Sequence, residues 1–368
     1  MLDRSKLIRQ ITTNASRITI VKDDQVALAV KTWNVILCDS NFQTNLLNAS
    51  LPWSVPSWQG DLGQITQFQT PRVDYTVVAS DGSQIYPDRH MGNNCYLINT
   101  GVVTLVYGDK SRASFDSEPY FFTNVNRFEG SVADYIDSKR HELEIADGLK
   151  TVLAMPQADS LLYLADGSLI AWHLFGKGAE LCEQFLPVYF EQLQHFYAQR
   201  MPFVGYISLP NSKELVGLLR AQLCNFVSSA AEANLLETVV DADFLSQILP
   251  PFQMTTWFKS GVAAAQAYPE NLKPYFAYLN TGNEIARIEV PAWIVHDTVL
   301  LQHCMQIVVD QVHKGYGYPV CLAEAHQQAV IKAPDRTFFY HAINQITNQK
   351  NGGTTLSRKL RQKQVMGF

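Results

Sequence analysis

The stretch Leu161-Leu-Tyr-Leu-Ala-Asp166-Gly-Ser168 decides the fold, because it is a short apolar run that stops at a turn signal. Its length and its Asp-Gly ending are typical of a buried β-strand. Apolar residues at three- and four-residue spacing follow and predict an amphipathic helix. They are Leu181, Phe185, Val188, Tyr189, Leu193, Phe196 and Tyr197. Pro202-Phe-Val-Gly-Tyr-Ile-Ser-Leu209 then reads as a second buried strand, so the segment predicts strand, helix, strand.

On the N-terminal side of this stretch, the residue types favour adjacent antiparallel strands. Val73-Asp-Tyr-Thr-Val-Val-Ala79 is β-branched and aromatic and is read as ending at Asp81-Gly-Ser, and residues 96–107 form a long strand or strand pair. Residues 131–152 predict a helix with a charged outer face. Early strands followed by strands that alternate with helices indicate the α/β class, with a mixed β-sheet flanked by helices.

On the C-terminal side, residues 274–279 and 286–291 flank Asn280-Thr-Gly-Asn283, which predicts a hairpin. Helices are expected over residues 297–313 and 334–347. We expect the chain to divide into an N-terminal helical and connector segment (1–70), a main domain (71–348) and a basic tail (349–368). The main domain is expected to contain a helical insertion at about 211–272.

Composition excludes several classes of protein. Hydrophobic residues make up 47% of the 368-residue chain and charged residues 17%, enough apolar surface to exclude a mostly disordered chain. No run of about 18 apolar residues predicts a membrane span, and the first ten residues lack an apolar signal core. The six cysteines contain no C-x-x-C pair, which predicts reduced thiols rather than disulfides or a zinc site. We therefore expect a cytoplasmic protein.

Charge is unevenly distributed along the chain. The net charge is −5, yet the residues from Lys350 onward carry five basic side chains and no acidic one. Those beyond the hinge-like Asn351-Gly-Gly are Arg358, Lys359, Arg361 and Lys363. A basic tail on an acidic body is able to contact DNA phosphates. The alternative interpretation is an ordinary solvated terminus.

Two predicted strands end in the same tripeptide, Asp81-Gly-Ser and Asp166-Gly-Ser. We predict that Asp81 and Asp166 lie on adjacent strands, where the two carboxylates can share a divalent cation with phosphate oxygens and water as further ligands. The alternative is that Asp-Gly is here only the common turn dipeptide. Between the two, the helix acids Glu142 and Glu144 are two positions apart and so point to different faces, which allows one of them to be a ligand without indicating which.

One histidine stands in an unusual setting. Tyr318-Pro-Val-Cys-Leu-Ala-Glu-Ala-His326 places His326 among small residues after an apolar run. Its imidazole suits manganese or zinc, or general acid–base work, and the alternative is a buried structural histidine. The chain contains no P-loop, no G-x-G-x-x-G after a strand, no G-x-S-x-G elbow and no H-E-x-x-H helix.

These motifs, in this order, resemble the NurA nuclease family over about residues 70–345. The residues that carry the resemblance are Asp81-Gly-Ser83, Arg140 to Glu144, Leu164-Ala-Asp166-Gly-Ser-Leu-Ile170, Gly205-Tyr-Ile-Ser208, Tyr278-Leu279 with Arg287-Ile-Glu-Val-Pro291, and Tyr318-Pro319 with Glu324-Ala-His326.

The resemblance implies an RNase H-like fold and a Mn²⁺-dependent nuclease, with Mg²⁺ as a possible substitute. It implies single-strand endonuclease and 5'-3' exonuclease activity on DNA in double-strand-break processing, a ring-like homodimer, and work with a HerA-like hexameric ATPase. Asp81, Glu144 (or Glu142) and Asp166 would be metal-binding carboxylates, His326 would complete the metal site, and Tyr318 would be catalytic or would position the substrate.

Two alternatives belong to other classes. One is a non-catalytic DNA- or ATPase-binding module on the same fold, and the other is a metal-dependent phosphatase acting on small molecules. Hydrolysis of a phosphodiester by two metals needs an acidic cluster that binds those metals, whereas a bare binding module does not.

Overall fold

The structure is a computed structural model that describes residues 2–14, 23–68, 74–88, 95–123, 131–155, 160–227 and 236–351. Its strands are β1 (Ser57–Trp58), β2 (Ile65–Gln67), β3 (Tyr75–Ile85), β4 (Tyr96–Tyr107), β5 (Arg112–Phe122), β6 (Leu161–Asp166), β7 (Phe203–Ile207), β8 (Gln253–Thr255), β9 (Phe258–Lys259), β10 (Pro274–Asn280) and β11 (Ile285–Pro291). Its helices are α1 (Arg4–Thr13), α3 (Asp23–Cys38), α4 (Phe42–Leu47), α5 (Val132–Leu153), α6 (Ala179–Ala198), α7 (Glu214–Leu223), α8 (Asp241–Ile248), α9 (Ala263–Gln266), the 3₁₀ helix η2 (Glu270–Leu272), α10 (Ala292–Val295), α11 (Thr298–Lys314), α12 (Val320–Ala329) and α13 (Ala333–Asn351).

A single mixed sheet runs through the molecule in the order β1-β9-β10-β11-β7-β6-β3-β4-β5. Strands β3, β4 and β5 are antiparallel neighbours, β3, β6 and β7 are parallel, and β11 is antiparallel to β7. The predicted strand–helix–strand over residues 161–209 is therefore β6, α6 and β7. The prediction of a mixed β-sheet flanked by helices is confirmed.

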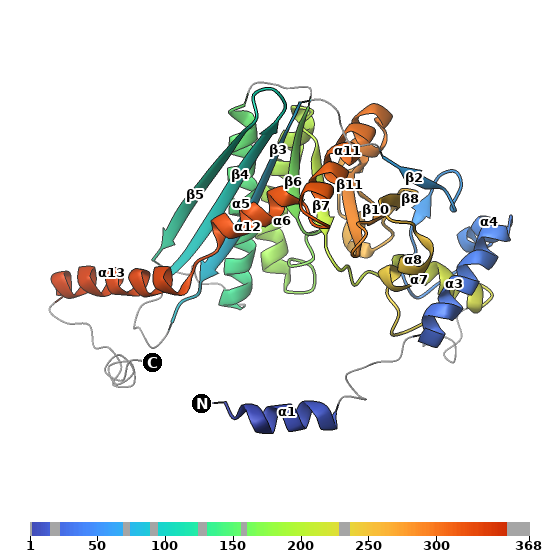
Figure 1. Ribbon diagram of the computed structural model, residues 1–368, viewed down its shortest axis with the longest axis horizontal. Coiled ribbons are helices and arrows are strands. Elements are labelled where there is room, and N and C mark those ends of the chain that lie inside the picture. Colours follow the sequence, from blue (N-terminus) through green and yellow to red (C-terminus); the bar gives the residue numbers. More distant parts are fainter. Residues whose placement is uncertain are drawn as a thin grey trace.

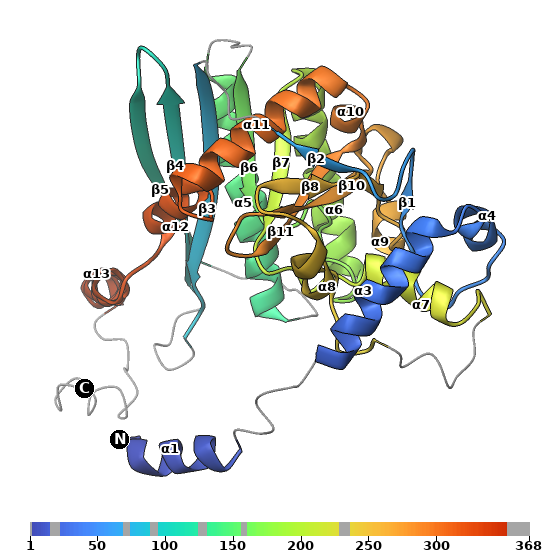
Figure 2. The same ribbon diagram turned by 45° about the vertical axis from the view of Figure 1, so that its right-hand side comes forward.

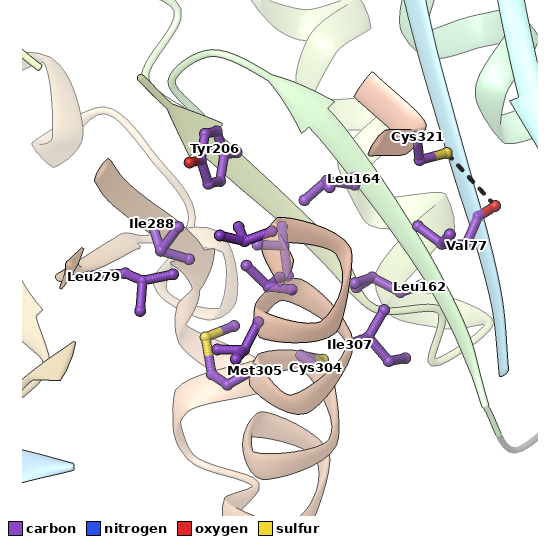
Figure 3. Packing of buried hydrophobic residues seen from close by; sticks show 14 of the residues in the cluster. Val77, Leu162, Leu164, Tyr206, Leu279, Ile288, Cys304, Met305, Ile307 and Cys321 are labelled. Atoms are coloured by element: carbon purple, nitrogen blue, oxygen red, sulfur yellow. Dashed lines mark hydrogen bonds between the residues drawn. The ribbon is translucent and has the colours of Figure 1, made fainter. Parts of the chain in front are cut away.

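Helices cover both faces of this sheet (Figure 1). Alternate side chains of a strand point to opposite faces, so each strand contributes to two cores. Val78 and Tyr163 pack with α5 and α6 on one face. Val77 and Leu164 pack with α11 and α12 on the other, where Cys321 lies with its Sγ 3.8 Å from the Val77 carbonyl oxygen (Figure 3).

The N-terminal segment and the insertion meet at the far end of the sheet from β5 (Figure 2). Helix α3 packs on α7 and α8, and the apolar side chains of all three belong to one core. The insertion contains short strands as well as the predicted helices, since β8 pairs with β2 and β9 with β1. The division of the chain into 1–70, 71–348 and 349–368 stays a prediction.

One expectation about β3 is wrong. The sequence predicts that the strand ends at Asp81-Gly-Ser, but β3 continues to Ile85 and pairs with β4 along its whole length, from Tyr75 opposite Tyr107 to Ile85 opposite Leu97. The ladder supplied by a long neighbouring strand overrides the local turn preference of Asp-Gly. Only Asp166 stands at a strand end.

The described helices include none that is both long enough and apolar enough to cross a lipid bilayer.

Candidate active site

Asp81 and Asp166 lie on adjacent parallel strands at the same level of the sheet. Ser80 of β3 pairs with Ala165 of β6, so each aspartate is the next residue along its strand. Each also follows, two residues on, a side chain buried beneath α11 and α12, and side chains two apart in a strand share a face. The prediction that the two aspartates lie on adjacent strands is confirmed, and their sharing of a metal stays a prediction.

His326 reaches the two aspartates from α12, and Tyr318 does so from the second residue before that helix. His326 Nδ1 lies 2.8 Å from Asp81 Oδ2. The Tyr318 hydroxyl donates a hydrogen bond to the Asp166 carboxylate. Because α12 packs directly on β3 and β4, its position fixes both side chains against the sheet. Residues some 150 to 245 positions apart in the chain therefore converge at one place.

Glu144 approaches the same place from the other face of the sheet. Its backbone carbonyl oxygen accepts a hydrogen bond of 2.7 Å from Ser80 Oγ, which ties α5 to β3. Its side chain lies against Gly82, where a Cβ would come within 2.5 Å of Glu144 Oε1. Glu144 therefore fills the space that the missing side chain of Gly82 leaves, one residue from Asp81 and on the opposite face of β3.

The structure separates the two helix acids that the sequence leaves open. Glu142 Oε1 forms an ion pair of 2.6 Å with Lys139 Nζ. Glu144 is 12% exposed, with Oε1 2.9 Å from Arg140 Nη1, and this oxygen is buried yet accepts no well-aligned hydrogen bond from the described residues. A buried carboxylate oxygen with unused acceptor capacity fits a cation ligand. Of the two helix acids, Glu144 is the one that packs against β3, beside Asp81.

The electrostatics of the cluster favour a bound cation. Desolvation raises the pKa of Asp166, the negative charge of Asp81 raises it further, and the hydrogen bond from Tyr318 opposes both. Burial and the charge of Asp166 raise the pKa of Tyr318, so its hydroxyl keeps its proton and remains a donor. Two neighbouring carboxylates that repel each other are relieved by a positive ion between them.

The sequence does not identify Arg140 and His141, which lie beside Glu144, or His173, which packs on His141, as site residues. Arg140 donates to the Gly82 carbonyl oxygen over 2.9 Å, and His141 Nδ1 lies 3.4 Å from Glu144 Oε2. The ring centroids of His141 and His173 are 4.6 Å apart. Burial lowers the pKa of His173 to about 3, and the charge of His141 is the second cause. The helical spacing of Arg140 and Glu144 is a usable signal. Nothing in the sequence connects His173 to them.

The donor set fits a divalent metal in chemistry. Carboxylate oxygens suit Mg²⁺ and Mn²⁺, and imidazole suits Mn²⁺. Within the residues that the structure describes, however, no three His, Cys, Asp or Glu side chains lie close enough together to hold one ion. The binding of a metal by Asp81, Asp166, Glu144 and His326 therefore stays a prediction.

The substitution Gly82→Ala tests how tightly the site is built. A Cβ at this position lies 2.9 Å from both Arg140 Cγ and Glu144 Cγ, so the helix side chains must move and take the Glu144 carboxylate with them. We expect a loss of nuclease activity of at least about tenfold, with the chain still folded. Gly60→Ala is a reference for the loss of a glycine, because a Cβ at Gly60 meets no atom within 4 Å, although its positive φ of 75° adds strain. Equal activity of Gly82→Ala and the parent protein would contradict the packing described here.

The four tail residues proposed to contact DNA, Arg358, Lys359, Arg361 and Lys363, lie outside the described residues.

The chain is similar to known proteins in sequence and in fold. The family model described as NurA domain matches residues 75–331. No curated protein matches. The solved NurA nuclease from Sulfolobus solfataricus is 11% identical with a TM-score of 0.52, over 96% of this chain and 100% of that one. Another NurA structure (9% identity, TM-score 0.38) covers 88% of this chain and 98% of its own, and Endonuclease V from Bacillus subtilis (10%, 0.35) covers 82% and 91%.

The Sulfolobus structure matches nearly the whole chain, so the two proteins share a fold. Together with the antiparallel β3, β4 and β5 and the parallel β6 and β7, it confirms the expected RNase H-like fold.

Proposed function

The chain belongs to the NurA domain family, and from this premise we propose that it is a metal-dependent nuclease that hydrolyses phosphodiester bonds in DNA. The observation that carries the proposal is the position of Asp81 and Asp166 next to each other on β3 and β6. His326 and Tyr318 contact them from one face of the sheet, and Glu144 packs on Gly82 from the other. Carboxylates that bind metal ions are what phosphodiester hydrolysis by two metals requires.

We assign the roles as follows. Asp81, Asp166 and Glu144 hold the metal, Mn²⁺ or alternatively Mg²⁺, and His326 completes its ligands. The metal would supply positive charge at the scissile phosphate. Tyr318 orients the Asp166 carboxylate through its hydrogen bond. His326, whose side chain is 60% exposed, orients Asp81 and is accessible for proton transfer at its ring.

The proposal extends to the biological setting that the family resemblance implies. The protein would be a cytoplasmic homodimer with single-strand endonuclease and 5'-3' exonuclease activity, processing DNA double-strand-break ends with a HerA-like hexameric ATPase. The Sulfolobus protein carries the name of a nuclease, and this name supports the activity here.

A nuclease assay on labelled single- and double-stranded DNA tests the activity. We expect cleavage with Mn²⁺, weaker cleavage with Mg²⁺, and none with a chelator. DNA binding without cleavage under any of these metals would favour the alternative, a non-catalytic DNA- or ATPase-binding module on the same fold.

Removing residues 354–368 tests the basic tail. We expect weaker binding of duplex DNA and nearly unchanged metal-dependent cleavage of short oligonucleotides, because the tail carries four basic side chains and no acid. Four lost phosphate contacts flatten the slope of log affinity against log salt by about 3 to 4 units. If the tail binds the ATPase instead, the slope stays unchanged and co-purification with the ATPase is lost. An unchanged slope with unchanged co-purification would contradict both roles.

A further inference from the structure

The turn that follows Asp166 is held by hydrogen bonds to buried side chains. The Leu169 carbonyl oxygen accepts from the hydroxyls of Tyr189 (2.7 Å) and Tyr268 (2.8 Å). The Leu169 amide donates to Glu289 Oε2 over 2.7 Å, and Ser168 Oγ donates to the same oxygen over 2.8 Å. Glu289 is 1% exposed. One buried carboxylate of β11 therefore binds the turn at two points, two and three residues after a proposed metal ligand.

Glu289 is itself held by a buried ion pair. Its second oxygen, Oε1, accepts from Arg287 Nε over 2.7 Å, and Arg287 Nη2 donates to Glu214 Oε1 of α7 over 2.9 Å. Arg287 also lies over the Phe276 ring, with its Cζ 3.7 Å from the centroid. Removing water from three charges gives little net stability. Both oxygens of Glu289 are occupied by these hydrogen bonds, which fixes the orientation of its carboxylate.

We propose that Glu289 is a positioning residue, which holds the turn of residues 167–169 so that the Asp166 carboxylate is presented at the metal site. The consequence for metal binding rests on the proposed function. Gly167 reinforces the argument, since it has φ +113° and its amide donates to the Tyr206 carbonyl oxygen over 2.8 Å. The chain thus leaves β6 in a conformation that L side chains rarely adopt, and Glu289 binds the two residues that follow.

An amide cannot replace this carboxylate. In Glu289→Gln one of the two oxygens becomes an NH₂ group, which faces either Arg287 Nε–H or the Leu169 amide, donor against donor. Ser168 Oγ is able to turn and accept, but a backbone N–H is not. The substitution therefore either releases the turn or breaks the ion pair that orients residue 289.

Glu214 offers a closely matched control. Its Oε1 accepts from Arg287, and its Oε2 accepts from Ser260 Oγ (2.9 Å) and the Gly261 amide (3.0 Å). Arginine, serine hydroxyl and backbone amide are the same three donors that Glu289 receives, but the turn they bind carries no proposed site residue. Glu214→Gln thus makes the same chemical change in the same ion network, away from Asp166.

The test measures Mn²⁺ binding by calorimetry and amide hydrogen exchange over residues 166–171, on the full chain. We expect Glu289→Gln to weaken Mn²⁺ binding by about 10- to 100-fold, the range for partners that orient metal ligands, and to speed exchange in the turn. Glu214→Gln is expected to change neither. Ser168→Ala removes one of the two bonds to Glu289 without disturbing the ion pair, and also the bond of 3.0 Å from the Ile170 amide to Ser168 Oγ. Its readouts are therefore Mn²⁺ binding and exchange of the Leu169 amide, and both are expected to change less than in Glu289→Gln but in the same direction.

Four outcomes decide between the ideas. Equal effects of Glu289→Gln and Glu214→Gln would overturn the proposal in favour of a purely structural ion network, as would normal Mn²⁺ binding and exchange in Glu289→Gln. If Glu289→Gln does not fold, Ser168→Ala decides, and unchanged exchange and binding in that variant would overturn the proposal. If the parent protein binds no Mn²⁺ at Asp81, the proposed function fails, and hydrogen exchange alone decides whether Glu289 holds the turn.

Discussion

Asp81→Asn is expected to abolish metal-dependent DNA cleavage, with a loss of at least about a hundredfold, while the protein stays folded. The amide keeps the shape of the side chain, including the bond of 2.7 Å that Asp81 Oδ1 accepts from the Gly82 amide, but it removes the charge that a metal needs. The loss is expected to exceed the 10- to 100-fold typical of residues that only orient a ligand. Single-turnover cleavage of a labelled oligonucleotide in Mn²⁺ is the measurement.

Asp116→Asn is the control. Asp116 lies on exposed β5 of the same sheet, and its Oδ1 likewise accepts from the next backbone amide, that of Ser117, over 3.0 Å. We expect full activity from this variant. Full activity from Asp81→Asn as well would mean that Asp81 does not take part in the chemistry.

The stability of the metal-free Asp81→Asn variant should move in the opposite direction to its activity. Where Asp81 and Asp166 are both ionised their charges repel, which is one cause, after burial, of the raised pKa of Asp166. Removing the Asp81 charge at about pH 7 is therefore expected to raise the thermal midpoint slightly. As the pH falls through the raised pKa of Asp166, that carboxylate takes up a proton and the repulsion disappears. The two proteins should then unfold at converging temperatures.

The second large effect is expected from Glu144→Gln, with Glu142→Gln as its matched partner. Each substitution replaces a partly buried glutamate of α5, and the two glutamates are two positions apart. Glu144 packs against Gly82 and its charge adds to the raised pKa of Asp166, so it acts on the site, whereas Glu142 is paired with Lys139. We expect at least about a hundredfold loss of cleavage for Glu144→Gln and less than about threefold for Glu142→Gln, because a partly exposed ion pair contributes little.

Circular dichroism and thermal unfolding of both glutamine variants check that the difference is one of chemistry. The reverse ranking, with Glu142→Gln inactive and Glu144→Gln active, would show that the structure assigns the wrong helix acid to the site.

Local sequence patterns are sufficient for the centre of the fold. The apolar runs at residues 161–165 and 202–209 and the helical spacing between them correspond to β6, β7 and α6, because a buried strand and an amphipathic helix each impose their own period on the sequence. The sequence also identifies Asp81, Asp166, Tyr318 and His326 as candidates, and the structure brings all four together.

Features that depend on contacts distant in sequence could not be predicted. The end of β3 was misplaced because pairing with β4, not the local Asp-Gly preference, decides where the strand stops. The choice of Glu144 over Glu142 depends on which face of α5 meets Gly82. His173 carries no local signal, since its partner His141 lies 32 residues away. Glu289 stands in a motif of the family resemblance, but its contact with the turn after Asp166 joins residues 120 positions apart.

A crystal structure of the protein grown with Mn²⁺, with data collected at the manganese absorption edge, tests the central claim most directly. The account predicts an anomalous peak between the Asp81 and Asp166 carboxylates, at about 2.0 to 2.6 Å from an oxygen of each. A protein that cleaves DNA in Mn²⁺ but binds the ion elsewhere, with these two carboxylates more than about 10 Å apart, would contradict it.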